Sequence, residues 1–151
     1  MSDPITPFIG CDVFVPDASR SRVLLIRRAD NGFWALPGGF HDLHETPMRC
    51  AVRECLEETG LQIRIERLLG VFSSNCYREI NYPHKGRQYC HILFLAEPVD
   101  LAKSTPRTTN EAREIGWFTE TQIPPMSDGH DVRVTVGFRS LRDPQSPAHF
   151  E

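Results

Sequence analysis

The chain has 151 residues, which fits one full domain with a hydrophobic core and is too short for two ordinary domains. Hydrophobic residues make up 40% of the sequence and charged residues 25%, as is typical of a globular protein. The formal net charge of -3 excludes the generally basic surface with which some proteins wrap nucleic acid regardless of its sequence.

The first third of the chain predicts two strands and a sharp turn. Residues 9–15 read as a strand that ends at the turn signal Pro16-Asp17. Residues 23–28 form a short apolar and β-branched run, which is typical of a second strand. After Trp34-Ala35-Leu36, the triplet Pro37-Gly38-Gly39 predicts an abrupt change of direction, because glycine accepts positive φ without strain.

The clearest helix signal covers residues 46–59. Thr46 suits the N-cap and Pro47 suits the first helical position. Gly60 suits the left-handed residue just beyond the helix end.

The second half of the chain predicts mostly strands and loops. Residues 63–73 and 88–97 read as two longer strands, and the turn-rich segment between them favours a hairpin. Residues 98–110 read as a polar loop and residues 115–118 as a short strand. Residues 140–151 are expected to form a loose C-terminal tail.

Residues 132–139 divide the pattern. Val132, Val134, Val136 and Phe138 alternate as in a strand, whereas Val132 and Val136 also fit one face of a helix. The residues alone favour a strand.

Cysteine spacing and the absence of long apolar runs bear on the cellular setting. The five cysteines are odd in number and none forms a C-x-x-C pair: Cys11, Cys50, Cys55, Cys76 and Cys90. Reduced thiols are therefore the better interpretation, rather than a disulfide framework or a zinc site. No apolar run approaches a membrane span and residues 1–7 lack a signal-peptide pattern. We expect a cytoplasmic protein with no membrane partner and no stable nucleic-acid partner.

Three glutamates at the end of the predicted helix carry the chemical signal. Glu54, Glu57 and Glu58 stand at i, i+3 and i+4, so their carboxylates are expected on one face. Like charges at i,i+4 cost roughly 0.2–0.5 kcal/mol, and anions near a helix C-terminus are disfavoured by about 0.3–1 kcal/mol each. A bound divalent cation would relieve this repulsion, and oxygen-only ligands favour Mg²⁺, with Mn²⁺ as a substitute.

A longer pattern surrounds these glutamates. It reads GFHDLHETPMRCAVRECLEETGL and fixes the following positions: Gly39, Glu45, Arg53, Glu54, Glu57, Glu58, Gly60 and Leu61. The pattern resembles the Nudix box of the Nudix hydrolases, with Cys55 in a slot that usually holds an aliphatic residue. Trp34 to Gly39 resembles the lead-in of many members, and Glu111 with Trp117-Phe118 resembles a late acidic position and strand.

The resemblance implies a fold. It predicts an α/β (α+β) architecture in which a mixed β-sheet lies between helices as an α/β/α sandwich. Residues 1–151 would form a single Nudix domain. Residues 132–139 would lie in the second major helix, and we adopt this expectation over the strand pattern because fold context often overrides local propensity.

The resemblance also implies roles. The implied metal ligands are the carbonyl of Gly38 and the carboxylates of Glu54, Glu57, Glu58 and Glu111, with Glu114 as an alternative to Glu111. Arg53 and Glu45 would form a salt bridge that orients the catalytic helix, and Gly39 and Gly60 would be structural.

The implied chemistry follows from charge. Mg²⁺ would neutralise a diphosphate, lower the pKa of a bound water and fix the group for in-line displacement. A carboxylate then accepts the proton of the water, and both Glu54 and Glu111 remain candidates for this base. The expected catalytic residues are Glu54, Glu57, Glu58, Arg53 and Glu111.

The substrate is less well defined. Arg27, Arg28 and Tyr77 are the candidate substrate contacts, while the histidines, including His91 and His130, form no spaced ligand set and favour ordinary surface or loop roles. The family cleaves nucleoside diphosphate derivatives, so ADP-ribose or nucleotide sugars, nucleoside triphosphates and dinucleoside polyphosphates all stay open, as does a homodimer. The alternatives are a non-catalytic nucleotide sensor and an isoprenoid-diphosphate isomerase on the same fold.

Overall fold

The computed structural model describes residues 6–73, 88–100 and 105–151. Within these ranges its strands are β1 (Phe8–Phe14), β2 (Arg22–Arg28), β3 (Trp34–Ala35), β4 (Gly38–Phe40), β5 (Ile63–Ser73), β6 (Tyr89–Pro98), β7 (Ala112–Thr119) and β8 (His149–Phe150). Its helices are α1 (Pro47–Thr59) and α2 (His130–Arg142), with a 3-10 turn η2 (Glu120–Gln122).

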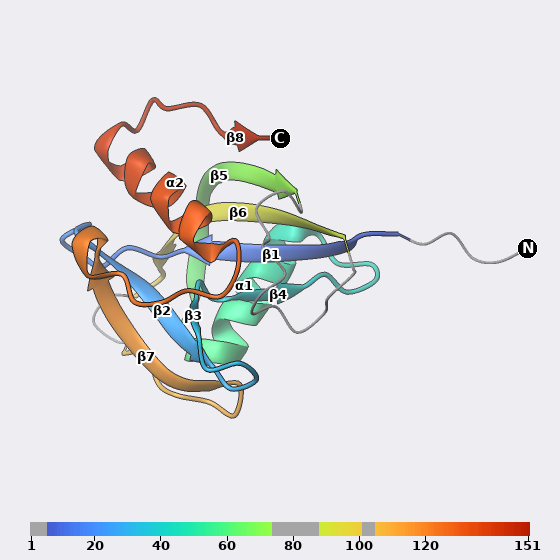
Figure 1. Cartoon of the computed structure of the whole chain (residues 1–151), viewed down its shortest axis with the longest axis horizontal. Helices are drawn as coiled ribbons and strands as arrows, with labels where there is room; N and C mark the ends of the chain where they lie inside the picture. The colour runs from blue at the N-terminus through green and yellow to red at the C-terminus, as the bar shows by residue number, and fades with distance from the viewer. Residues whose placement is uncertain (1–5, 74–87, 101–104) are drawn as a thin grey trace, which may run out of the picture.

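The strands form two sheets. The larger is mixed and has the order β4-β1-β6-β5-β8, with β1 parallel to β6 and β5 parallel to β8. The smaller has the order β3-β2-β7 and is antiparallel. Figure 1 shows α2 in front of the larger sheet and α1 behind it.

The two helices cover opposite faces of β1 because successive side chains of a strand point to opposite sides. Val13 packs with Ala51 and Cys55 of α1. Its neighbour Phe14 packs with α2, where its ring meets that of Phe138 edge to face at a centroid distance of 5.2 Å. The predicted mixed sheet between helices is therefore confirmed.

The ends of α1 are fixed by the residues that the sequence indicated. The hydroxyl of Thr46 accepts a hydrogen bond from the N–H of Arg49, and Pro47 occupies the first turn. Gly60 ends the helix with φ +72°, and its N–H donates to the carbonyl of Leu56. Such a left-handed residue favours glycine, which has no Cβ to clash.

Helix α2 confirms the family-based prediction for residues 132–139 against their strand-like alternation. Val134, Phe138 and Leu141 pack into the core below the larger sheet at i, i+4 and i+7. That spacing puts them on one helical face, and burial of this face outweighs the preference of the valines for strands.

The predicted strands lie where the sequence placed them, to within a few residues. The prediction for 63–73 matches β5, and β6 runs antiparallel to it. The predicted hairpin connection falls on residues 74–87, outside the described chain. Strand β7 is longer at both ends than the predicted 115–118.

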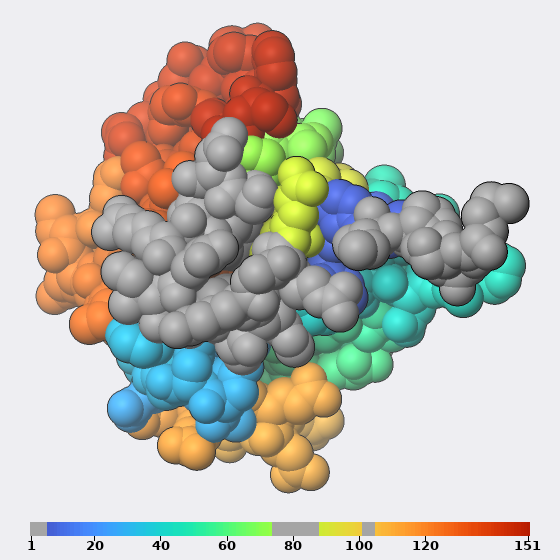
Figure 2. Space-filling view, turned by 45° about the vertical axis from the view of Figure 1, so that its right-hand side comes forward, coloured from blue at the N-terminus to red at the C-terminus, as the bar shows by residue number. Residues whose placement is uncertain are grey.

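The prediction that residues 140–151 form a loose tail is wrong. Residues 140–142 belong to α2, and β8 pairs in parallel with Gly70 and Val71 of β5. His149 also stacks on Phe72, with ring centroids 4.7 Å apart. Figure 2 shows the red C-terminal residues lying against the green atoms of β5. Backbone pairing and this ring contact hold a segment whose polar composition resembles a tail.

Two further observations concern the described ranges alone. None of their helices is both long enough and apolar enough to cross a membrane. Cys11, Cys50, Cys55 and Cys90 are free thiols, and Cys76 lies outside the described residues.

Candidate active site

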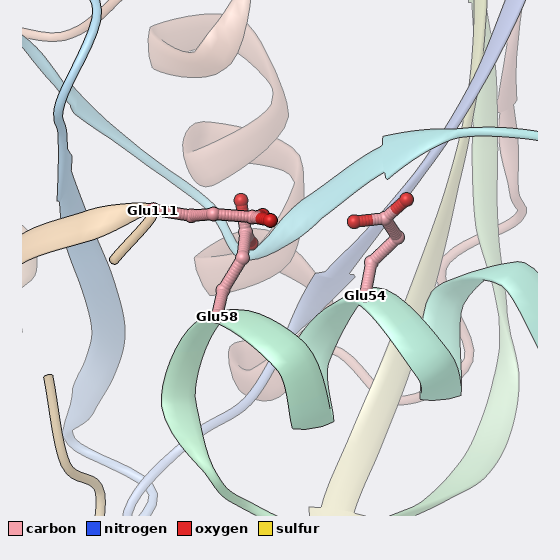
Figure 3. A group of neighbouring side chains, drawn as sticks. All are labelled: Glu54, Glu58 and Glu111. Carbon is pink, nitrogen blue, oxygen red and sulfur yellow. The ribbon is translucent and has the colours of Figure 1, made fainter. Parts of the chain in front are cut away.

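Three carboxylates converge at one end of α1. Oxygen atoms of Glu54, Glu58 and Glu111 all lie within 4.8 Å of one another. Figure 3 shows Glu54 and Glu58 rising from successive turns of the same helix, while Glu111 reaches over Glu58 from the opposite side. The i,i+4 spacing brings the first two together, and Glu111 reaches them from the position just before β7.

Glu58 is the most deeply placed of the three, with 8% of its surface exposed. Its Oε2 accepts a hydrogen bond of 2.8 Å from the N–H of Gly38. Burial raises the pKa of Glu58 well above its usual value, the Gly38 hydrogen bond opposes this, and the nearby charge of Glu54 adds to it. Burial also raises the pKa of Glu54. Neighbouring carboxylates with raised pKa values make a site that a cation would stabilise.

Gly39 permits the close approach of Glu54. A Cβ at this position would lie 2.3 Å from the carboxyl carbon of Glu54, so the Glu54 side chain would have to move away. The glycine predicted to be structural therefore leaves the space that this carboxylate occupies.

Arg53 organises the outer side of the carboxylates. Its Nε donates to Glu45 at 2.8 Å, so the predicted ion pair is present, and its Nη1 donates to Glu54 at 2.8 Å. The hydrogen bond from Arg53 lowers the pKa of Glu45 to about 2. Glu57 also pairs with Nη1 of Arg53, at 3.2 Å, and is exposed. The described carboxylate cluster therefore contains Glu54, Glu58 and Glu111, and the role of Glu57 as a metal ligand stays a prediction.

A pocket of about 510 Å³ opens beside the carboxylates. Glu54, Glu58 and Glu111 line it together with Gly38 and Gly39. The volume lies within the roughly 300–1,000 Å³ usual for small-molecule sites.

The predicted substrate contacts separate. Arg28 lines the pocket, and its guanidinium donates twice to Asp30, at 2.8 and 2.6 Å. Arg27 does not line the pocket: it donates to the carbonyl of Gly32 and pairs with Glu114 at 2.6 Å. Glu114, the alternative to Glu111, is thus held by Arg27 outside the carboxylate cluster. Tyr77 lies outside the described residues.

Three further pocket residues were not predicted as part of a site, and the surface or loop roles predicted for His91 and His130 are wrong, because both residues are buried. Asp12 of β1, His91 of β6 and His130 of α2 are all buried and all line the pocket. His91 Nδ1 lies 2.8 Å from Oδ2 of Asp12, and Nε of the fully buried Arg133 lies 3.0 Å from the same oxygen. Burial opposes ionisation of Asp12, but the charges of Arg133 and His91 outweigh it and hold the pKa of Asp12 well below its usual range.

These residues left only weak signals in the sequence. Asp12 stands among apolar residues of a buried strand, which is unusual for an unpaired acid. Its partners lie 79 and 121 positions later, so no local spacing connects them.

A profile of the NUDIX domain matches residues 7–135. The chain belongs to the Nudix family. This match covers most of the chain, including the cluster of Glu54, Glu58 and Glu111.

Two curated relatives and one solved structure illustrate the relationship. The chain is 35% identical over 114 residues to a MutT-like protein of Streptomyces ambofaciens, covering 75% of this chain and 66% of that one. It is 32% identical over 114 residues to an ADP-ribose pyrophosphatase of Methanocaldococcus jannaschii, covering 74% and 62%. The chain thus spans slightly less than two thirds of these relatives. The crystal structure of a UDP-X diphosphatase matches with a TM-score of 0.81 at 22% identity, over 99% of this chain and 70% of that one, which supports the fold.

Proposed function

We propose that this Nudix protein hydrolyses a diphosphate linkage in a nucleoside diphosphate derivative with the help of a divalent cation, Mg²⁺ or Mn²⁺ in its place. The observation that carries the proposal is the convergence of Glu54, Glu58 and Glu111 on one pocket. A diphosphate repels an incoming nucleophile through its own negative charge, so its hydrolysis needs concentrated positive charge at the reacting group.

The donor set fits a hard cation. It consists of carboxylate oxygens, which are the ligands that Mg²⁺ and Mn²⁺ prefer. Glu58 is nine-tenths buried and carries a raised pKa, so the ionised form of this residue would gain from a bound cation. Bound there, the cation would supply charge neutralisation and a more acidic water.

The residues around the cation would each have one task. Glu54, Glu58, Glu111 and the carbonyl of Gly38 would hold it, and the exposed Glu57 would join them by turning away from Arg53. Arg53, bound to Glu45 and Glu54, would keep the carboxylates oriented. Either Glu54 or Glu111 would accept the proton from the attacking water.

ADP-ribose and nucleotide sugars are the first substrates to test. The Methanocaldococcus jannaschii relative is named as an ADP-ribose pyrophosphatase, and it shares 32% identity over 114 residues. Arg28 lies in the pocket where it would meet a phosphate after exchanging its partner Asp30. Tyr77 stays a candidate contact, and nucleoside triphosphates and dinucleoside polyphosphates complete the panel.

The test is a hydrolysis panel with Mg²⁺ in water enriched in ¹⁸O. Attack of water at phosphorus forms one P–O bond and breaks the bridging P–O bond, so one phosphorylated product must carry the label. We expect at least one member of the panel to yield a labelled product, with loss of turnover in excess EDTA and in Glu58→Gln. Glu120→Gln, which changes an exposed glutamate paired with Arg142, is the matched control.

Other results would point to other functions. Tight nucleotide binding with no turnover of any panel member would favour a sensor. Rearrangement of isopentenyl diphosphate without phosphate release would favour an isomerase. Either result would overturn the proposed hydrolysis.

A further inference from the structure

The proposed hydrolysis assigns no role to the side of the pocket opposite the carboxylate cluster. His91 and His130 line it, although only 4% and 3% of their surfaces are exposed. Their rings lie 6.5 Å apart and close to perpendicular, at 69°. Buried imidazoles that border a pocket have few polar directions left, so their hydrogen bonds decide what they can offer to a ligand.

Hydrogen-bond partners fix the proton position on both rings. The N–H of Leu36 donates to Nδ1 of His130 at 3.1 Å, so this nitrogen carries no proton and the ring is neutral with its proton on Nε2. Asp12 is an ionised acceptor, so Nδ1 of His91 carries the proton that points to it. The atom that His130 can offer to a bound molecule is therefore a donor, Nε2–H.

The layer beneath these rings carries no spare charge. Arg133 is fully buried and its Nε lies 3.0 Å from the carboxylate of Asp12, so the two opposite charges are paired. Burial, reinforced by Arg133 and opposed in part by Asp12, lowers the pKa of His130 well below its usual value, which agrees with a neutral ring. Charge for phosphate groups is available elsewhere in the pocket, at the carboxylate cluster once it holds a cation and at Arg28.

We propose that His130 donates its Nε2–H to an uncharged acceptor on the nucleoside part of the substrate, a sugar oxygen or a base atom, and so determines which compounds bind. This inference rests on the proposed function. A neutral donor in a neutral, buried setting matches a neutral acceptor, because a phosphate placed there would lose its hydration without gaining a cation.

Two substitutions separate this role from a structural one. In His130→Asn, the side-chain oxygen lies near the position of Nδ1 and still accepts the N–H of Leu36, but no donor reaches the position of Nε2. In His130→Gln, the amide reaches the position of Nε2 but leaves the buried N–H of Leu36 without its acceptor. His130→Asn should keep its thermal stability and bind the nucleotide more weakly. His130→Gln should lose thermal stability and keep its affinity for the nucleotide.

Binding is measured calorimetrically with AMP, ribose 5-phosphate and inorganic phosphate in the presence of Mg²⁺. We expect AMP to bind His130→Asn about 2- to 10-fold more weakly than wild type, the factor for one neutral hydrogen bond. An equal loss for ribose 5-phosphate assigns the acceptor to the sugar, and a loss confined to AMP assigns it to the base. Inorganic phosphate should bind wild type and His130→Asn with equal affinity.

Several results would overturn the inference. One is an unchanged affinity of His130→Asn for AMP, and another is a loss of affinity for inorganic phosphate as large as the loss for AMP. A third is a loss of affinity in both variants that follows their loss of stability. The last is failure of wild type to bind AMP. Because the assay needs no turnover, it can also be run in Glu58→Gln. A protein that binds AMP through His130 but hydrolyses nothing would refute the proposed function, while the hydrogen bond from His130 to the nucleoside would still be supported.

Discussion

The two sides of the pocket bury charge in opposite ways. On the α1 side, Glu54 and Glu58 lie beside Glu111 within 4.8 Å, and burial raises the pKa of both helix glutamates. On the β1 side, the carboxylate of Asp12 is matched by the guanidinium of Arg133 and its pKa is low. On the α1 side, a bound cation would be needed to compensate the clustered carboxylates. On the β1 side, Arg133 already compensates the carboxylate of Asp12. The first is thus suited to bind ions, and the second to hold fixed neutral donors.

The largest expected effect is a loss of stability on the β1 side of the pocket. Arg133→Met should lower the free energy of unfolding by about 3–5 kcal/mol, because it leaves the buried charge of Asp12 without its partner. Arg142→Met, which removes an exposed partner of Glu120, should cost at most about 1 kcal/mol. Urea unfolding measures both. Equal costs would mean that Asp12 and Arg133 do not form the buried pair described above.

The carboxylate side should instead affect activity. Glu58→Gln should lower kcat/KM by at least about 100-fold, beyond the range usual for residues that only orient a ligand. Glu57→Gln should lose less, because Glu57 is exposed and paired with Arg53 outside the cluster. Steady-state kinetics at saturating Mg²⁺ compares them. A loss in Glu57→Gln as large as that in Glu58→Gln would show that Glu57 contributes as much to cation binding as the buried Glu58.

A smaller loss is expected for the pair that orients the carboxylates. Glu45→Gln removes one charge from the pair with Arg53 without touching the cluster. We expect kcat/KM to fall by about 10- to 100-fold, with a higher Mg²⁺ requirement. Activity measured over a range of Mg²⁺ concentrations tests this. A wild-type profile would leave Glu45 without a role in orienting Arg53.

The smallest effect is a pH dependence of the metal-free protein. A raised folded-state pKa for Glu58 stabilises the fold at low pH, and this stabilisation is lost as pH rises through that pKa. Thermal stability in EDTA should therefore increase as the pH falls from neutrality toward the usual carboxyl range. The low pKa of Asp12 acts in the opposite sense, with its contribution lost only in stronger acid. Glu58→Gln should reduce this change of thermal stability with pH. An unchanged pH dependence in that variant would contradict the raised pKa of Glu58.

The two sides also differ in how far the sequence predicts them. Glu54 and Glu58 are four residues apart on one helix, so local geometry alone places them together. Helix α1 was predictable for the same reason, since Thr46, Pro47 and Gly60 act through neighbouring backbone groups. Glu111 needed the family resemblance, because only the packing of β7 brings it to α1.

The Asp12 side could not be predicted because it arises from tertiary contacts. His91 lies 79 positions from Asp12, and His130 lies 94 positions from its partner Leu36. The prediction of a loose tail was wrong at residues 149 and 150 for the same reason, because their strand exists only through pairing with Gly70 and Val71. The pairing of Glu57 with Arg53, which also binds Glu54, is likewise a side-chain arrangement that residue spacing does not specify.

The most direct test of the account is a titration of the purified protein with Mn²⁺, followed by calorimetry and by thermal unfolding. We predict that wild type binds Mn²⁺. At a free concentration 100 times the Kd, its free energy of unfolding should rise by about 2.7 kcal/mol, which raises the unfolding temperature. Glu58→Gln should bind much more weakly, and Glu120→Gln should behave as wild type. Absence of binding by wild type, with and without a nucleotide, would contradict the claim that Glu54, Glu58 and Glu111 form a cation site.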